Sequence, residues 1–115
     1  AQSESDYQAN TPLSYIREKI RQNDQNSSLS VGSIEGKDCL ILQSDGISTY
    51  IYAYDGNLKE LYIRNDIVAH AKDGKDILEI KDFQIHELSN VLFRVSCQAP
   101  DGTSQSVILS ERSAR

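Results

Sequence analysis

Four Asp-Gly dipeptides divide most of this sequence into short segments, and they constrain the fold more than any other feature. They stand at residues 45–46, 55–56, 73–74 and 101–102. Glycine adopts positive φ at little steric cost, and aspartate bonds to nearby backbone, so the pair is typical of tight turns. Short strands joined by tight turns pair antiparallel, because parallel strands need long crossover connections. We therefore expect an antiparallel sheet.

The segments around these turns contain the residue types of strands. Seven ranges are predicted: 29–34, 38–43, 48–54, 58–64, 77–88, 91–99 and 104–109. The fifth range changes its apolar-polar parity near Lys81 and Asp82, which predicts a bulge or a bend. In the sixth range the alternate residues Phe93, Val95 and Cys97 share one face.

One amphipathic helix is predicted before the strands, over residues 12–22. Thr11 is a suitable N-cap, because its hydroxyl accepts a bond from a free backbone N–H of the first turn. Leu13, Ile16 and Ile20 follow at helical spacing. The apolar stripe that they form is narrow, so we expect the helix to lie on a sheet.

The predicted fold class is α+β, with one N-terminal amphipathic helix packed on an antiparallel β-meander. The 115 residues fit a single domain. We expect a polar lead-in at 1–10, the helix at 12–22 and antiparallel strands within 29–109. The net charge is −5 and the charges are interspersed, which argues against nucleic acid or an anionic membrane surface as the main partner.

Residues 49–63 read as a hairpin with two alternative registers. A two-residue loop places Ile51 opposite Glu60, whereas a three-residue loop places Ile51 opposite Leu61. We favour the three-residue loop, because it collects apolar partners on both faces and because Asn57 tolerates the left-handed position of a bulged turn.

In the favoured register, four of the six tyrosines share one face of the hairpin. The core face then holds Ile51, Ala53, Leu61 and Ile63, and the other face holds Tyr50, Tyr52, Tyr54, Leu58 and Tyr62. Tyrosine is enriched in protein interfaces, so Tyr50, Tyr52, Tyr54 and Tyr62 are candidate contact residues for a protein partner. Ordinary packing of these rings under a loop is the alternative.

The sequence contains no motif of a catalytic, cofactor-binding or metal site, and we predict that the protein is not an enzyme. It has no G-x-S-x-G, G-x-G-x-x-G or P-loop pattern. The loop at 65–79 comes nearest to a metal site, through Asp66, His70, Asp73, Asp76 and Glu79. It lacks the ligand spacing of an EF-hand, so we expect a solvated loop, with calcium binding as the alternative.

Two cysteines, Cys39 and Cys97, stand far apart within apolar strand segments. Buried free thiols are the expected state, because free cysteine behaves as a small hydrophobic residue. A disulfide between strands is the alternative if the protein is exported.

Three stretches carry a resemblance to a known family: residues 15–24, the hairpin residues 49–61 and the closing residues 109–113. With the order of lead-in, helix and meander, the chain resembles the globular part of type IV pilin-like proteins, the pseudopilins of Gram-positive bacteria. In particular it is similar to a family of functionally uncharacterised domains from anaerobic Firmicutes. The matching positions are structural, so no functional residue is carried over.

The resemblance implies a non-catalytic structural subunit of a type IV pilus, competence or secretion-type assembly, with other pilin-like subunits as partners. Pilin-like proteins begin with a long apolar helix that anchors them in the membrane. The sequence contains no methionine and no such helix, so we expect the anchor upstream, in a longer protein tethered at the cell surface. The alternative function is a secreted extracellular binding module that uses the tyrosine-rich face.

Overall fold

The structure is a computed structural model that describes residues 12–22, 28–44 and 46–111. Helix α2 spans Pro12–Gln22, the range over which the sequence predicts a helix. The predicted lead-in at 1–10 and the Thr11 N-cap lie outside the described residues.

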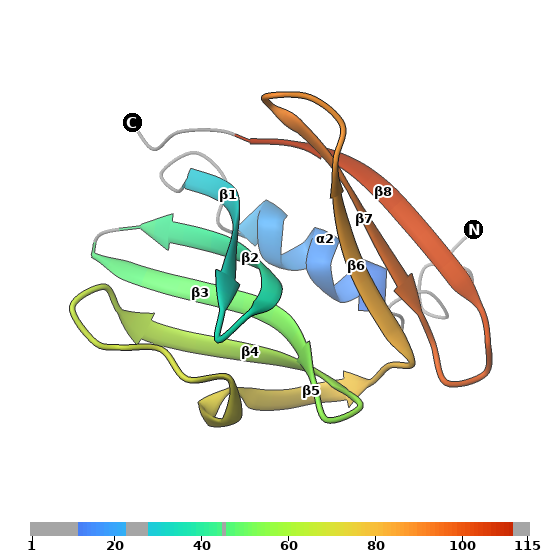
Figure 1. Cartoon of the computed structure of the whole chain (residues 1–115), viewed down its shortest axis with the longest axis horizontal. Coiled ribbons are helices and arrows are strands. Elements are labelled where there is room, and N and C mark those ends of the chain that lie inside the picture. The colour runs from blue at the N-terminus through green and yellow to red at the C-terminus, as the bar shows by residue number, and fades with distance from the viewer. Residues whose placement is uncertain (1–11, 23–27, 45, 112–115) are drawn as a thin grey trace.

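Eight strands follow the helix in the described part of the chain (Figure 1). They are β1 (Ser28–Ile34), β2 (Lys37–Ser44), β3 (Ile47–Tyr54), β4 (Asn57–Arg64), β5 (Lys75–Glu79), β6 (Asp82–Glu87), β7 (Leu92–Gln98) and β8 (Ser104–Ser110). They form a five-stranded sheet in the order β1-β2-β3-β4-β5 and a three-stranded sheet in the order β6-β7-β8. All neighbouring strands are antiparallel. The α+β class is therefore confirmed, but the expected meander is divided into two sheets.

The division falls between Ile80 and Lys81, inside the segment that the sequence predicts as one strand. The Ile80 N–H donates to the Gly56 carbonyl at 3.0 Å, whereas the Lys81 N–H donates to the Gln98 carbonyl at 2.7 Å. Two consecutive residues thus bond to different sheets. The predicted bulge or bend near this point is a complete strand break.

Helix α2 and both sheets share one apolar core, with the helix lying between the sheets (Figure 1). Its buried members are Leu13, Ile16, Leu29, Leu40, Leu42, Ile51, Leu58, Ile80, Phe93, Val95 and Cys97. The predicted common face of Phe93, Val95 and Cys97 is confirmed. Full burial of one such aliphatic side chain contributes roughly 1.5–3 kcal/mol, so this core is the main source of stability.

The β3–β4 hairpin has the register that we did not favour from the sequence. Ile51 pairs with Glu60 across a two-residue loop of Asp55 and Gly56. Both loop residues have positive φ, 55° and 81°. This is the combination of a type I′ turn, whose twist matches that of the flanking strands. The three-residue loop was wrong because Asp55, and not Asn57, adopts the left-handed conformation.

This one-residue difference places the β4 side chains on the faces opposite to those predicted. Leu58 joins Ile51 in the core shared with the helix. Leu61 packs with Tyr52 on the other side of the five-stranded sheet, which we call the outer face. The predicted pairing of Ile51 and Leu61 on one core face was therefore wrong.

Cys39 and Cys97 are both buried free thiols. Cys97 belongs to the core shared with the helix, whereas Cys39 belongs to the cluster on the outer face. Burial raises the pKa of each thiol to about 12. The structure therefore agrees with the expectation of free thiols and not with a disulfide.

Candidate protein-contact surface

The four candidate tyrosines do not form one surface. Tyr50, Tyr52 and Tyr54 lie on the outer face, whereas Tyr62 pairs with Thr49 and lies on the helix side of β4. Tyr62 is 68% exposed and Tyr52 is 0% exposed. Tyr50 and Tyr54 are half-buried. The predicted tyrosine face was wrong for the same reason as the hairpin register.

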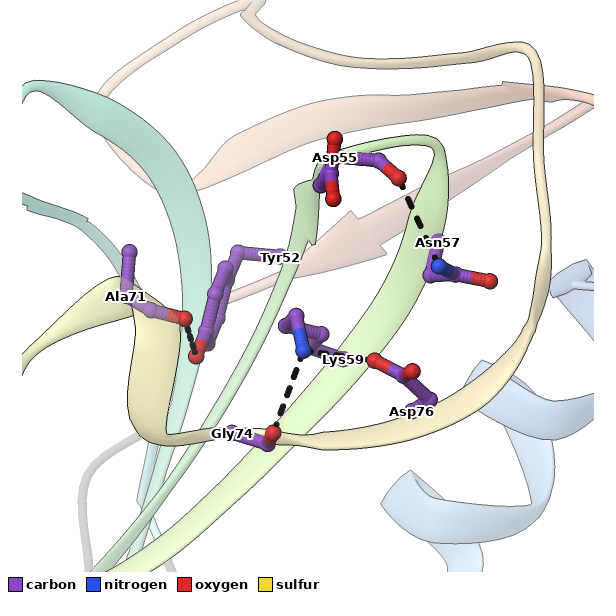
Figure 2. Close-up of polar contacts among 7 residues, drawn as sticks. All are labelled: Tyr52, Asp55, Asn57, Lys59, Ala71, Gly74 and Asp76. Carbon is purple, nitrogen blue, oxygen red and sulfur yellow. Dashed lines mark hydrogen bonds and ion pairs between the residues drawn. The ribbon is translucent and has the colours of Figure 1, made fainter.

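Tyr52 is buried beneath residues 65–74, which we call the covering loop and which contains the 3-10 turn η1 (Ala71–Asp73). Its hydroxyl donates a hydrogen bond of 2.6 Å to the carbonyl of Ala71 (Figure 2). Burial raises the pKa of Tyr52. The alternative of a tyrosine packed under a loop is thus the correct one for this residue.

Gly74 permits this close contact. A Cβ atom at this position would lie 2.3 Å from the Tyr52 hydroxyl oxygen. Its φ is −68°, which any residue adopts, so the lack of a side chain matters here and not the freedom of the backbone. The Asp73-Gly74 dipeptide is a site of close approach, and not the positive-φ turn that the sequence suggests.

Lys59 on β4 fixes the end of the covering loop. Its ammonium group donates to the Gly74 carbonyl at 3.2 Å and pairs with Asp76 at 2.5 Å (Figure 2). Lys59 is buried, at 9% exposure, and a buried ammonium group needs such partners to offset its loss of hydration. The sequence reading missed this residue, because its partners lie 15 and 17 positions away.

Glu35, in the β1–β2 turn, holds the other end of η1. One carboxylate oxygen accepts from the Ala71 N–H at 2.8 Å, and the other lies 3.2 Å from Nδ1 of His70. The bond from Ala71 and the contact with His70 lower the pKa of Glu35. Three side chains, Glu35 from the β1–β2 turn, Tyr52 from β3 and Lys59 from β4, therefore fasten the covering loop to the outer face.

Two of the acidic residues predicted to come nearest to a metal site have separate ion-pair partners. Asp66 pairs with Arg64 at 2.9 Å, and Asp76 pairs with Lys59. Among the residues that the structure describes, no three His, Cys, Asp or Glu side chains are grouped to hold a metal ion. The pair of Asp76 with Lys59 lies beside the bond from Lys59 to Gly74, at the end of the covering loop.

An open cleft of about 160 Å³ lies where the β3–β4 turn meets the β5–β6 connection. Its lining includes Lys37, Tyr54, Asp55, Lys81, Asp82 and Phe83. The ammonium groups of Lys37 and Lys59 lie 5.5 and 5.6 Å from the centroid of the Tyr54 ring, within the range of a cation–π contact. The cleft thus has charges of both signs beside Tyr54.

Large apolar side chains are exposed in two other places. Ile67 and Val68 project from the covering loop, close in sequence to Tyr62. The second group comprises Leu88, Val91, Leu92 and Ile108, in the three-stranded sheet and the turn between β6 and β7. The alternation that places Phe93 on the inner side of β7 puts its neighbour Leu92 on the other side, so the sequence contains a signal for its exposure. The apolar pair Ile67-Val68 inside an irregular segment was a signal that we did not use.

In the part of the chain that the structure describes, α2 is too short and too polar to cross a membrane.

The family model for a domain of unknown function, DUF4860, matches residues 7–99. This range contains the helix and every strand from β1 to β7. No curated protein and no solved structure matches the chain. The family match agrees with the resemblance to an uncharacterised domain family.

Proposed function

The chain belongs to the DUF4860 family, and we propose that it is a non-catalytic structural subunit, a pseudopilin-like component of a type IV pilus, competence or secretion-type assembly. In this proposal an apolar helix upstream of residue 1 tethers the domain at the cell surface. Its partners are other pilin-like subunits.

The observation that carries the proposal is the arrangement of one N-terminal helix packed across antiparallel sheets. The resemblance to pilin-like proteins implies a helix packed on an antiparallel sheet, and the α+β class agrees with that expectation. The state of the thiols supports a role without thiol chemistry, because a nucleophilic cysteine needs a lowered pKa. Burial raises the pKa of both Cys39 and Cys97 to about 12.

Exposed side chains on and after β4 are the best candidates for the contact with a sister subunit. Tyr62 presents most of its ring to solvent, and Ile67 and Val68 follow it in the covering loop. Aromatic and aliphatic side chains of this kind commonly contribute the central contacts of an interface. The proposed contact therefore narrows from the four tyrosines to Tyr62, the most exposed of them.

Cell fractionation of the source bacterium tests this proposal. We expect the full-length protein in the membrane or sheared-surface fraction, where added protease digests it on intact cells. The variant Tyr62→Ala should keep the domain folded and reduce its co-purification with sister subunits, whereas Lys72→Ala, an exposed change in η1, should not. A full-length protein that is cytosolic and protected from protease would exclude a surface assembly.

The cleft beside Tyr54 favours a second candidate, an extracellular module that binds a small polar ligand such as a carbohydrate. Aromatic side chains with a few polar groups that fix the ligand are the usual features of such sites. Titration with a panel of sugars, followed by NMR, tests it. We expect shifts at Lys37 and Tyr54 that Tyr54→Ala abolishes. If no sugar shifts these signals at millimolar concentration, this candidate is wrong.

A further inference from the structure

Strand β8 lies at the edge of the three-stranded sheet and lacks the features that protect most edges. Its seven residues, Ser-Gln-Ser-Val-Ile-Leu-Ser, include no charge and no proline. Its pairing with β7 runs without a bulge from Ser104 to Ser110. An edge of this kind presents free N–H and C=O groups to any strand that approaches, so proteins usually protect it with charge, proline, a bulge or a covering segment.

The other sheet edges differ from β8. Strand β5 carries Lys75 and Asp76, and its pairing with β4 contains a register shift. Strand β6 carries Asp82 and Glu87. Strand β1 is uncharged but has Gly32 near its centre, and glycine weakens a strand. The described part of the chain therefore has one edge, β8, that combines strong strand formers with no protecting residue.

The backbone groups of β8 that point away from β7 can be identified. The Glu111 N–H donates to the Val91 carbonyl at 2.7 Å. Because direction alternates along an antiparallel strand, the N–H and C=O groups of Ser106, Ile108 and Ser110 point outward. Among residues 12–22, 28–44 and 46–111, β7 is the one strand paired with β8. Within these residues, the outward groups of β8 are therefore available for a further strand.

We propose that β8 pairs antiparallel with β8 of a second copy of this chain, about a two-fold axis at Ile108. The outward N–H of each Ile108 then donates to the C=O of the other Ile108. The outward groups of Ser106 bond in the same way to those of Ser110 in the second copy. On the core side, Val107 meets Leu109 in both directions. The pairing brings no like charges together and is self-complementary, as a two-fold contact requires. This inference deepens the proposed function and rests on it, because it names a contact between sister subunits.

Exposed apolar side chains support the same register. Ile108 is 54% exposed and Leu92, its diagonal neighbour on β7, is 37% exposed, on the same side of the sheet. In the pair, Ile108 lies against its copy, Arg94 of β7 flanks each Ile108 directly, and Leu92 lies diagonally beside it on the same side of the joined sheet. Directly opposed β-branched residues on neighbouring strands stabilise a sheet, so the exposure of Ile108 is explained by a partner strand.

Sedimentation of the 115-residue chain over a range of concentrations tests the proposal. We expect a dimer that Ile108→Pro weakens at least about tenfold, because proline removes outward hydrogen bonds at the centre of the contact. The fold should persist, since the Ile108 N–H does not bond to β7. Glu87→Pro is the matched control. Its N–H also points outward, because the neighbouring Leu88 N–H donates to Leu92, and it should leave the dimer unchanged.

A second variant protects the test from a folding defect. If Ile108→Pro lowers the melting temperature, Ile108→Lys decides, because it keeps the N–H and places two ammonium groups together across the axis. A wild-type chain that stays monomeric, or a dimer that persists unchanged in a folded Ile108 variant, would overturn the proposal. Cell fractionation tests the proposed function separately from the β8 pairing. A monomeric protein at the cell surface would refute the β8 pairing alone. A cytosolic protein that pairs through β8 would refute the proposed function.

Discussion

The two faces of the five-stranded sheet are covered in different ways. On the helix side, aliphatic residues such as Ile51 and Leu58 pack against α2 and β7. On the outer face, the covering loop lies over the next residue, Tyr52, and polar contacts from Glu35 and Lys59 fasten it. Ile51 and Tyr52 are equally buried, at 0% exposure, although they depend on different interactions.

This difference determines how each face responds to change. Apolar burial has no direction and tolerates small rearrangements, whereas a hydrogen bond weakens steeply when its distance or angle is disturbed. The outer face also has fewer buried apolar residues than the core shared with the helix. We therefore expect the covering loop to open locally before the sheet unfolds.

Tyr52→Ala should have the largest effect on the outer face. It removes a fully buried aromatic ring together with the hydrogen bond to Ala71. The expected loss is about 3–5 kcal/mol in the free energy of unfolding, the range for large aromatic side chains in a core. Denaturant unfolding followed by circular dichroism measures it.

Tyr62→Ala is the control for this comparison. Its ring is mostly exposed, so the free energy of unfolding should change by no more than about 0.5 kcal/mol. If Tyr52→Ala were as mild as Tyr62→Ala, the covering loop would not be part of the folded core.

Gly74→Ala should give the next-largest loss in the free energy of unfolding. The added Cβ has no room beside the Tyr52 hydroxyl, so the ring or the loop must move, at a cost of about 1–3 kcal/mol. Chemical shifts of residues in η1 should change with it. Lys72→Ala, two residues earlier and exposed, should leave the stability unchanged.

Tyr52→Phe separates the hydrogen bond from the packing. The ring remains, but the Ala71 carbonyl loses its donor. Because the net value of one hydrogen bond is about 0.5–1.5 kcal/mol, the loss should lie in that range and be smaller than for Tyr52→Ala. Hydrogen exchange should accelerate in the covering loop and not in β7. Equal acceleration in both would mean that the loop opens only with global unfolding.

The helix-side face could be predicted from the sequence, because its signals are local. The spacing of Leu13 and Ile16 identifies the helix, and the alternation of Phe93, Val95 and Cys97 identifies the inner side of β7. Periodicity of this kind reports burial directly. Burial can therefore be predicted without knowing which distant residue each side chain contacts.

The outer face could not be predicted in the same way. Which β4 residues lie on it depends on the register of the β3–β4 hairpin, and the φ angle of Asp55 decides that register. A shift of one residue moves every β4 side chain to the opposite face. The cover of the outer face depends on Ala71, whose partners Tyr52 and Glu35 lie 19 and 36 residues away. No local pattern encodes these contacts, and so the candidate tyrosine surface was misplaced.

Glu35→Gln should give the smallest and most local effect, seen in the pH dependence of the loop. The bond from the Ala71 N–H lowers the pKa of Glu35 below its ordinary value of 4.5. A carboxylate with a lowered pKa in the folded state stabilises that state above the ordinary pKa, and this contribution is lost as the pH falls through the lowered value. The wild-type loop should thus be protected at neutral pH and lose protection below pH 4.5.

Hydrogen exchange of the Ala71 and Asp73 amides, expressed as protection factors, measures this loss. In Glu35→Gln the protection should be lower at neutral pH and nearly independent of pH, because the titrating group is gone. Asp101→Asn is the control. The carboxylate of Asp101 also has a lowered pKa, from bonds with Thr103. It lies in the β7–β8 turn and not against the covering loop, so this change should leave the pH profile of the loop as in the wild type. If the loop of Glu35→Gln kept the wild-type pH profile, Glu35 would not be one of its anchors, and the outer cover would depend on Tyr52 and Lys59 alone.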